Sequence, residues 1–105
     1  LMVEAFLNDS APTQDLLKRL PITINLHQHQ AREYYADIRL DKESPTQGGY
    51  QVGDIAYWAP GNSLVFFYDK GYTGSLIIMV KMINSLNDLS KMGGSFQARI
   101  ERVED

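Results

Sequence analysis

The feature that most constrains the fold of this chain is a pair of strand-forming runs separated by a tight turn in the middle of the sequence. Residues 55–58 (Ile-Ala-Tyr-Trp) and residues 63–68 (Ser-Leu-Val-Phe-Phe-Tyr) are rich in aromatic and β-branched side chains, which favour strands. Between them, residues 59–62 read Ala-Pro-Gly-Asn, and Pro, Gly and Asn have the backbone preferences of turns. The pattern therefore predicts an antiparallel hairpin.

Further strands are predicted on both sides of this hairpin. Residues 22–26 and 95–103 alternate apolar and polar side chains, which indicates half-buried strands. Residues 75–83 are almost continuously apolar, which indicates burial on both faces or a place at a barrel seam. Shorter strands are predicted over residues 2–7 and 34–38.

Two short helices are predicted between these strands. The first follows Asp9 or Ser10, either of which can cap it, and it carries Pro12 in its first turn, where a missing N–H costs nothing. The second is capped by Asn84 or Ser85, and a pair of glycines ends it.

Three polar stretches are predicted to connect the elements. Residues 27–33 and residues 69–74 are expected to form turns. Residues 39–53 contain several glycines and charged side chains, and they are expected to form a loop longer than most connections in small domains. Because long loops often carry function, this loop is a place to look for a site.

These elements indicate a mainly β fold with about seven strands and two short helices. Such strands either pack as a sandwich or close into a barrel, and closure removes exposed strand edges. The 105 residues are close to the commonest size of one domain, so residues 1–105 are expected to form a single domain with one core. The predicted architecture is a closed or nearly closed β-barrel.

Composition and charge argue against several kinds of partner and chemistry. The chain has no cysteine, which excludes disulfides, thiolate metal sites and cysteine nucleophiles. A net charge of −3 without a cluster of Lys and Arg argues against nucleic acid as a partner, and no apolar run approaches the roughly 20 residues of a membrane span. We expect a soluble protein without a cofactor, favour the cytoplasm, and leave the oligomeric state open. The chain begins inside an apolar segment at Leu1, which is compatible with a trimmed export signal.

The hairpin region also resembles a known family. Residues 53–64, Gly-Asp-Ile-Ala-Tyr-Trp-Ala-Pro-Gly-Asn-Ser-Leu, followed by residues 66–68 and 71–72, are similar to the bacterial cyclophilin-like family, whose members are mainly of unassigned function. Over the rest of the chain the similarity is a matching order of elements. The resemblance implies the barrel fold of the cyclophilins, which are peptidyl-prolyl isomerases.

The same resemblance suggests site residues. In the isomerases an Arg and an apolar pocket built partly by a Phe-Phe strand bind the proline, so Arg39 is the catalytic candidate here, with Tyr50, Trp58 and Phe67 as walls of a ligand-binding cleft. An Arg that donates to the prolyl nitrogen would stabilise the twisted peptide bond, whose rotation barrier is about 20 kcal/mol. The aromatic-His-Arg signature of the isomerases is absent, since Asp37-Ile38 precedes Arg39. The alternative is a solvated Arg39 and a Phe67 in the core.

Two other sets of side chains are candidate sites. His27 and His29 would share one face of a strand and could both reach a metal, but the spacing fixes no third ligand, so we expect a polar turn and no metal site. The aromatic side chains between Tyr34 and Tyr72 exceed what one barrel face needs. Surplus aromatic residues beside a glycine-rich loop are typical of a peptide or small-molecule cleft.

We therefore expect a peptide- or small-molecule-binding or accessory domain without demonstrated catalysis, whose ligand crosses the hairpin at Trp58 and Phe67. The alternative is a weak peptidyl-prolyl isomerase that uses Arg39 and Phe67. A third alternative is a structural module fused to an enzyme.

Overall fold

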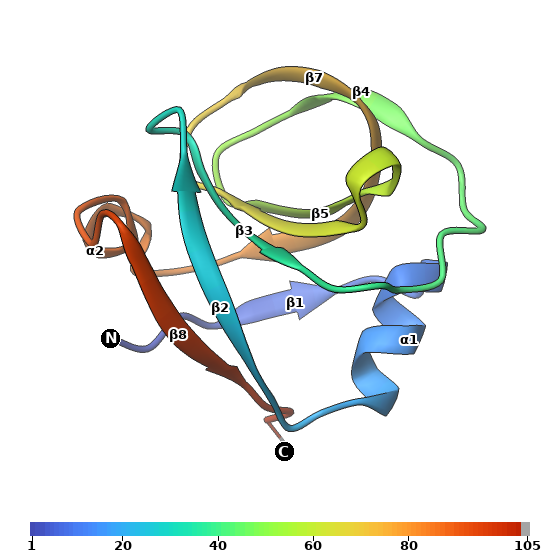
Figure 1. Ribbon diagram of the computed structural model, residues 1–105, viewed down its shortest axis with the longest axis horizontal. Helices are drawn as coiled ribbons and strands as arrows, with labels where there is room; N and C mark the ends of the chain where they lie inside the picture. Colours follow the sequence, from blue (N-terminus) through green and yellow to red (C-terminus); the bar gives the residue numbers. More distant parts are fainter. Residues whose placement is uncertain (104–105) are drawn as a thin grey trace.

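The computed structural model describes residues 1–103 and consists mainly of strands (Figure 1). Two α-helices and one turn of 3-10 helix accompany eight strands in the described residues. In chain order the elements are β1 (Ala5–Leu7), α1 (Ala11–Lys18), β2 (Ile22–His29), β3 (Glu33–Asp37), β4 (Gln47–Tyr50), β5 (Asp54–Trp58), η1 (Ala59–Gly61), β6 (Ser63–Phe67), β7 (Gly71–Met82), α2 (Leu86–Ser90) and β8 (Ser95–Ile100).

All eight strands belong to one curled, antiparallel sheet. Its order is β1-β7-β5-β6-β3-β2-β8, and β4 pairs with β7 beside this path. The sheet curls into a barrel that stays open, since β1 and β8 are the two ends of the strand order (Figure 1). The prediction of a mainly β, barrel-like fold with two short helices is confirmed, although the barrel is not closed.

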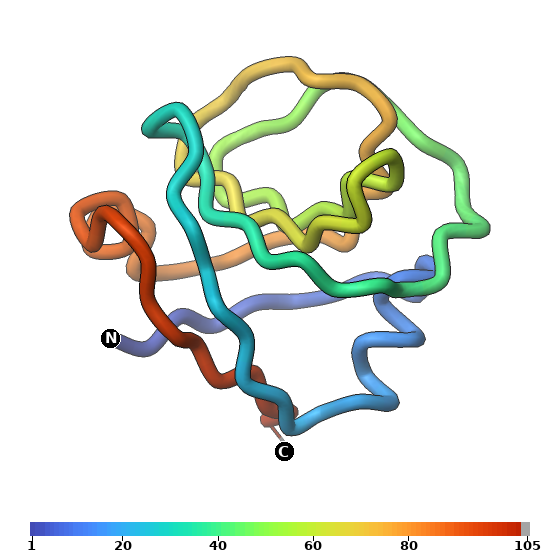
Figure 2. Tube along the Cα trace, in the orientation of Figure 1, coloured from blue at the N-terminus to red at the C-terminus, as the bar shows by residue number. Residues whose placement is uncertain are grey.

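The long strand β7 pairs with three other strands along its length and bends between them. Its first residues pair with β4, and its later residues pair with β5 and then with β1. Ser75 and Val80 have positive φ angles of 58° and 109°, and the register with β5 shifts between Ile55 and Ala56. These irregularities bend the strand. The start of β7 and β4 together form an arch on the far side of the ring from β5 and β6 (Figure 2).

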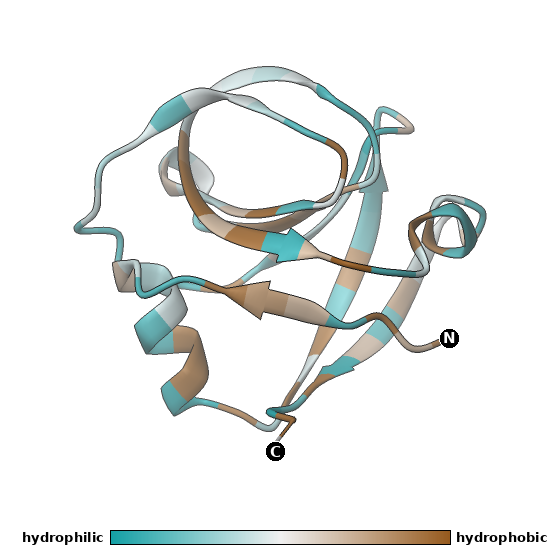
Figure 3. Cartoon of the chain, turned by 180° about the vertical axis from the view of Figure 1, so that it is seen from behind, coloured by the Kyte–Doolittle hydropathy of each residue, from teal (hydrophilic) through white to brown (hydrophobic). Residues whose placement is uncertain are grey.

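Apolar side chains are buried on both faces of the central strands. One face of the sheet packs against α1 and contains a large cluster that includes Leu16, Tyr34, Tyr57 and Leu64. The other face holds a smaller cluster, made by Tyr50, Ala56, Val65, Phe67 and Leu76. Figure 3 shows apolar segments in β1 and the second half of β7, whereas the arch is pale or hydrophilic.

Three connections differ from the sequence-based prediction. His27–His29 belong to β2 rather than to a turn, because they pair with Glu33–Tyr35 of β3. The predicted loop over residues 39–53 contains β4, and the predicted turn over residues 69–74 contains the start of β7. In both of these cases the strand forms because each segment is the other's pairing partner.

Candidate functional site

A cavity lined by two of the predicted cleft residues, Trp58 and Phe67, lies on the face of the smaller cluster and has a volume of about 700 Å³. The central strands supply its floor, the turn between β2 and β3 supplies one end, and the start of β7 supplies part of its wall. The side chains that matter below are Glu33, Tyr35 and Asp37 of β3, Ser63, Val65 and Phe67 of β6, Trp58 of β5, His29 and Arg32 of the β2–β3 hairpin, and Tyr72 of β7.

Strand register explains why these side chains share one face. Asp37 pairs with Ser63, and Ser63 pairs in turn with Trp58 on its other side. Successive residues of a strand point to opposite faces, so the alternate residues of β3 and β6 all face the cavity. Tyr35 and Val65 form the next such pair along the strands. Of the hairpin found in the sequence, β6 therefore contributes every second residue to this site and β5 contributes Trp58.

Trp58 lines the cavity and is held by its own turn. A Cβ atom on Gly61 would collide with the Trp58 ring, so the glycine leaves the room that the indole occupies beside the turn. Trp58 is the single tryptophan of the chain. It is half-buried, with the cavity on one side of it.

Phe67 also lines the cavity, whereas Tyr50 lies behind it. The Tyr50 and Phe67 rings stack with centroids 3.7 Å apart and planes 17° from parallel. Tyr50 is only 4% exposed and is not among the residues that line the cavity. Burial raises the pKa of its hydroxyl, which has no hydrogen-bond partner within residues 1–103. Of the predicted walls, Trp58 and Phe67 thus contact the cavity directly, and Tyr50 supports Phe67.

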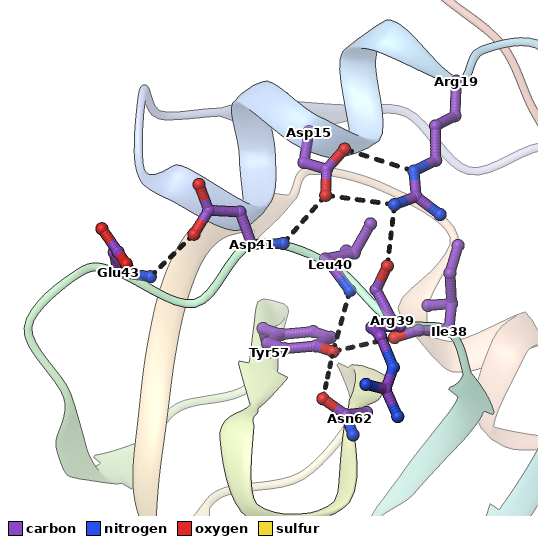
Figure 4. Close-up of polar contacts among 9 residues, drawn as sticks. All are labelled: Asp15, Arg19, Ile38, Arg39, Leu40, Asp41, Glu43, Tyr57 and Asn62. Carbon is purple, nitrogen blue, oxygen red and sulfur yellow. Dashed lines mark hydrogen bonds and ion pairs between the residues drawn. The ribbon is translucent and has the colours of Figure 1, made fainter.

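Arg39 lies outside the cavity. It is exposed beyond the end of β3, and its backbone carbonyl accepts a hydrogen bond of 2.8 Å from Nη2 of Arg19 (Figure 4). It is not among the residues that line the cavity with Phe67. The structure therefore does not place Arg39 beside Phe67, as the isomerase alternative requires.

The arginine that does line the cavity is Arg32, which the sequence reasoning missed. Its Cζ atom lies 5.9 Å from the centroid of the Tyr50 ring. Its Nη2 donates to Oε1 of Gln30, while its buried Nε has no hydrogen-bond partner within residues 1–103. The feature that explains the position of Arg32 is the hairpin between β2 and β3. The turn of this hairpin has positive φ angles at Gln30 and Ala31, and it returns Arg32 to the cavity.

A carboxyl and a histidine flank Arg32 at this end of the cavity. Glu33 of β3 lies directly opposite His29 of β2 in the register. Burial raises the pKa of the Glu33 carboxyl, and the nearby charges of His29 and Arg32 oppose this rise. His29 and His27 both have their rings near Tyr35, with centroids 6.2 Å and 5.6 Å away.

The two histidines share a face of β2, as their spacing predicts for a strand. Nδ1 of His27 lies 2.8 Å from the hydroxyl of Ser95 in the adjacent strand β8. Within residues 1–103, no three side chains of His, Cys, Asp or Glu gather closely enough to hold a metal ion. Neither α-helix of these residues has the length and the apolar composition of a membrane span.

A second, smaller hollow of about 420 Å³ lies between α1 and the connection that follows β3. Asp15 of α1 accepts hydrogen bonds there from the backbone N–H of Asp41, at 2.8 Å, and from Arg19 (Figure 4). The N–H of Asp41 and the side chain of Arg19 hold the pKa of the Asp15 carboxyl below its ordinary value of 3.8. These contacts tie the connection to the helix, which is a structural role.

The open barrel of eight strands with two short helices is consistent with a cyclophilin-like β-barrel. A model of the Cyclophilin-like family matches residues 2–101, so the chain belongs to that family. The search of curated proteins gave no match. The chain is similar to a solved structure, the solution structure of the hypothetical protein AF2241 from Archaeoglobus fulgidus, with 19% identity and a TM-score of 0.75 over 96% of this chain and 86% of that one. At this identity the likeness shows the fold alone. The similar structure is that of an archaeal protein, whereas the sequence resemblance is to a bacterial family.

Proposed function

We propose that this chain is a ligand-binding domain that holds a small molecule or a short extended peptide in the cavity lined by Trp58 and Phe67. The observation that carries the proposal is the cavity itself, because about 700 Å³ lies within the range of small-molecule sites. Its walls combine aromatic rings, which offer apolar contact, with about as many polar and charged side chains, which can orient a ligand.

The position of Arg39 favours binding over isomerisation. Arg39 is exposed and lies outside the cavity, so it does not face a proline ring bound on Phe67. Arg32 lies on the same cavity as Phe67, and any isomerase activity would depend on Arg32 instead. Binding requires only the cavity and its walls, and it is therefore the function that we propose.

Mapping of backbone amide chemical shifts tests this proposal. We expect short peptides or small aromatic compounds to shift the amides of Tyr35, Val65, Phe67 and Tyr72, which surround the cavity. Trp58→Ala should weaken such binding by roughly fivefold or more, because stacking on an aromatic ring contributes on the order of 1 kcal/mol.

Phe6→Ala is the matched control, since Phe6 is an aromatic side chain that is 68% exposed on β1 and does not line the cavity. It should leave the affinity unchanged. Shifts that gather around Phe6, or an affinity that Trp58→Ala does not alter, would show that the cavity is not the binding site.

A further inference from the structure

We propose that the ligand carries an alkylammonium or guanidinium group and that this cation binds between Asp37 and Trp58. The inference rests on the proposed ligand-binding function and specifies the charge and the orientation of the ligand. It follows from how the charged side chains are distributed along the cavity.

The two carboxyl groups of β3 that line the cavity differ in their surroundings. Glu33 lies opposite His29 and next to Arg32, and both of these groups favour its ionised form. Its negative charge is therefore balanced at its own end of the cavity. An added cation would meet repulsion from Arg32 there.

Asp37 lies at the other end, and the basic side chains that line the cavity, His29 and Arg32, both lie at the Glu33 end. Asp37 is four residues from Glu33 on the same strand, so about 13 Å separates the two residues along β3. Asp37 is exposed and belongs to none of the ion pairs formed within residues 1–103. Lys42 reaches the nearby turn, where its Nζ lies 3.5 Å from the Ala59 carbonyl and from Oδ1 of Asn62.

Trp58 adds a second group that favours a cation at the same end. It lies in the same row across the sheet as Asp37, with Ser63 between them. The indole ring attracts cations through the negative charge of its face, and the contact with Gly61 fixes the orientation of the ring. A carboxylate and an indole that flank one space can together hold an ammonium or guanidinium group.

Two sources supply this chemistry, the Lys or Arg side chain of a peptide and a free alkylamine. An extended peptide whose basic side chain lies at Asp37 would carry its backbone toward Arg32. A free amine would occupy only the end at Trp58. The experiment therefore includes a probe of each kind.

Fluorescence of Trp58, the single tryptophan, measures binding at this end of the cavity directly. The probes are N-acetyl-Ala-Xaa-Ala-amide peptides in which Xaa is Lys, norleucine or Glu, together with butylammonium chloride. We expect the Lys peptide to bind at least about fivefold more tightly than the norleucine peptide, which has the same alkyl chain without the charge. The Glu peptide should bind most weakly.

Asp37→Asn should reduce the preference for Lys over norleucine to less than twofold. Asp88→Asn, which removes the same charge from an exposed position on α2 and leaves the cavity unaltered, should retain the preference. Butylammonium that binds as tightly as the Lys peptide would identify a free amine as sufficient, and butylammonium that binds much more weakly would identify a peptide.

Three results would overturn the inference. Equal affinity for the Lys and norleucine peptides would show that the cavity does not select a cation, while the proposed binding function would stand. A preference that survives Asp37→Asn would place the cation elsewhere. If neither these probes nor the compounds used for shift mapping bind, the proposed function itself is wrong.

Discussion

The two faces of the β5–β6 hairpin differ in how they are covered, although the same two strands form both. On one face Tyr57 and Leu64 are fully buried in the large cluster. On the other face Ala56 and Val65 are also buried, but Val65 and its neighbour Trp58 border a cavity of about 700 Å³. Alternation along a strand therefore produces a filled face and a hollow face from one hairpin.

The difference shows what creates the cavity. Apolar side chains occupy both faces, so the hollow does not result from a polar patch in the hairpin. The filled face packs against α1 and is completed by residues of β2 and β8. The hollow face is enclosed partly by the arch of β4 and β7, and the stacked rings of Tyr50 and Phe67 fill only one part of it. The covering elements, rather than the hairpin, determine which face can bind a ligand.

The largest predicted effect on the free energy of unfolding comes from comparing substitutions at adjacent residues on the two faces. Leu64→Ala should lower the free energy of unfolding by about 2–5 kcal/mol, because it leaves a void among fully buried neighbours. Val65→Ala should cost roughly 1–2 kcal/mol, since it mainly loses the transfer energy of the removed groups next to space that already exists. Urea denaturation of both variants measures the difference. Equal losses would mean that the two faces are packed alike.

A second pair of variants compares tyrosine hydroxyls on the two faces. The hydroxyl of Tyr57 accepts from the buried N–H of Leu40 at 3.0 Å and donates to the carbonyl of Ile38 at 2.8 Å (Figure 4). Tyr57→Phe should therefore lower the free energy of unfolding by about 1–3 kcal/mol, because it leaves a buried donor without a partner.

Tyr35→Phe is the control on the hollow face. Tyr35 is half-buried beside the cavity, and its hydroxyl makes no hydrogen bond within residues 1–103. The free energy of unfolding should change by less than about 0.5 kcal/mol. A loss as large as that of Tyr57→Phe would show that the hollow face is as tightly constrained as the filled one.

The sequence predicts the hairpin, both helices and the barrel-like class because those features depend on residues that are close together in the chain. The central strands, for example, follow from the composition of residues 55–58 and 63–68 and from the turn between them. The strand β4 was missed, since Gln47–Tyr50 contains two glycines and becomes a strand only by pairing with β7, more than twenty residues away. Local composition cannot reveal such a partner.

The site residues, like the strands, could be predicted only where they depend on neighbours in the sequence. Trp58 and Phe67 belong to the hairpin, and the structure places both on the cavity. The resemblance to the isomerases points to Arg39 as the catalytic arginine, and nothing in the sequence singles out Arg32. The turn between β2 and β3 returns Arg32 to the cavity, whereas Arg39 follows the end of β3 and lies outside it.

The smallest predicted effect concerns two carboxyl groups with opposite pKa shifts, one on the cavity and one on the outer hollow. Burial raises the pKa of Glu33 above its ordinary value of 4.5, so its contribution to stability is present below that value and is lost as the pH rises through the raised pKa. Glu33→Gln should therefore raise the melting temperature at pH 7, and the gain should disappear in acid.

Asp15 should behave in the opposite way. Its hydrogen bonds from Asp41 and Arg19 lower its pKa, so its contribution is present above its ordinary value of 3.8 and is lost as the pH falls through the lowered pKa. Asp15→Asn should lower the melting temperature at pH 7 and have little effect in strong acid. Thermal unfolding of both variants between pH 3 and pH 8 tests the pair. If both variants shift the melting temperature in the same direction at pH 7, Glu33 is not destabilised by burial in the way that Asp15 is stabilised by its hydrogen-bond donors.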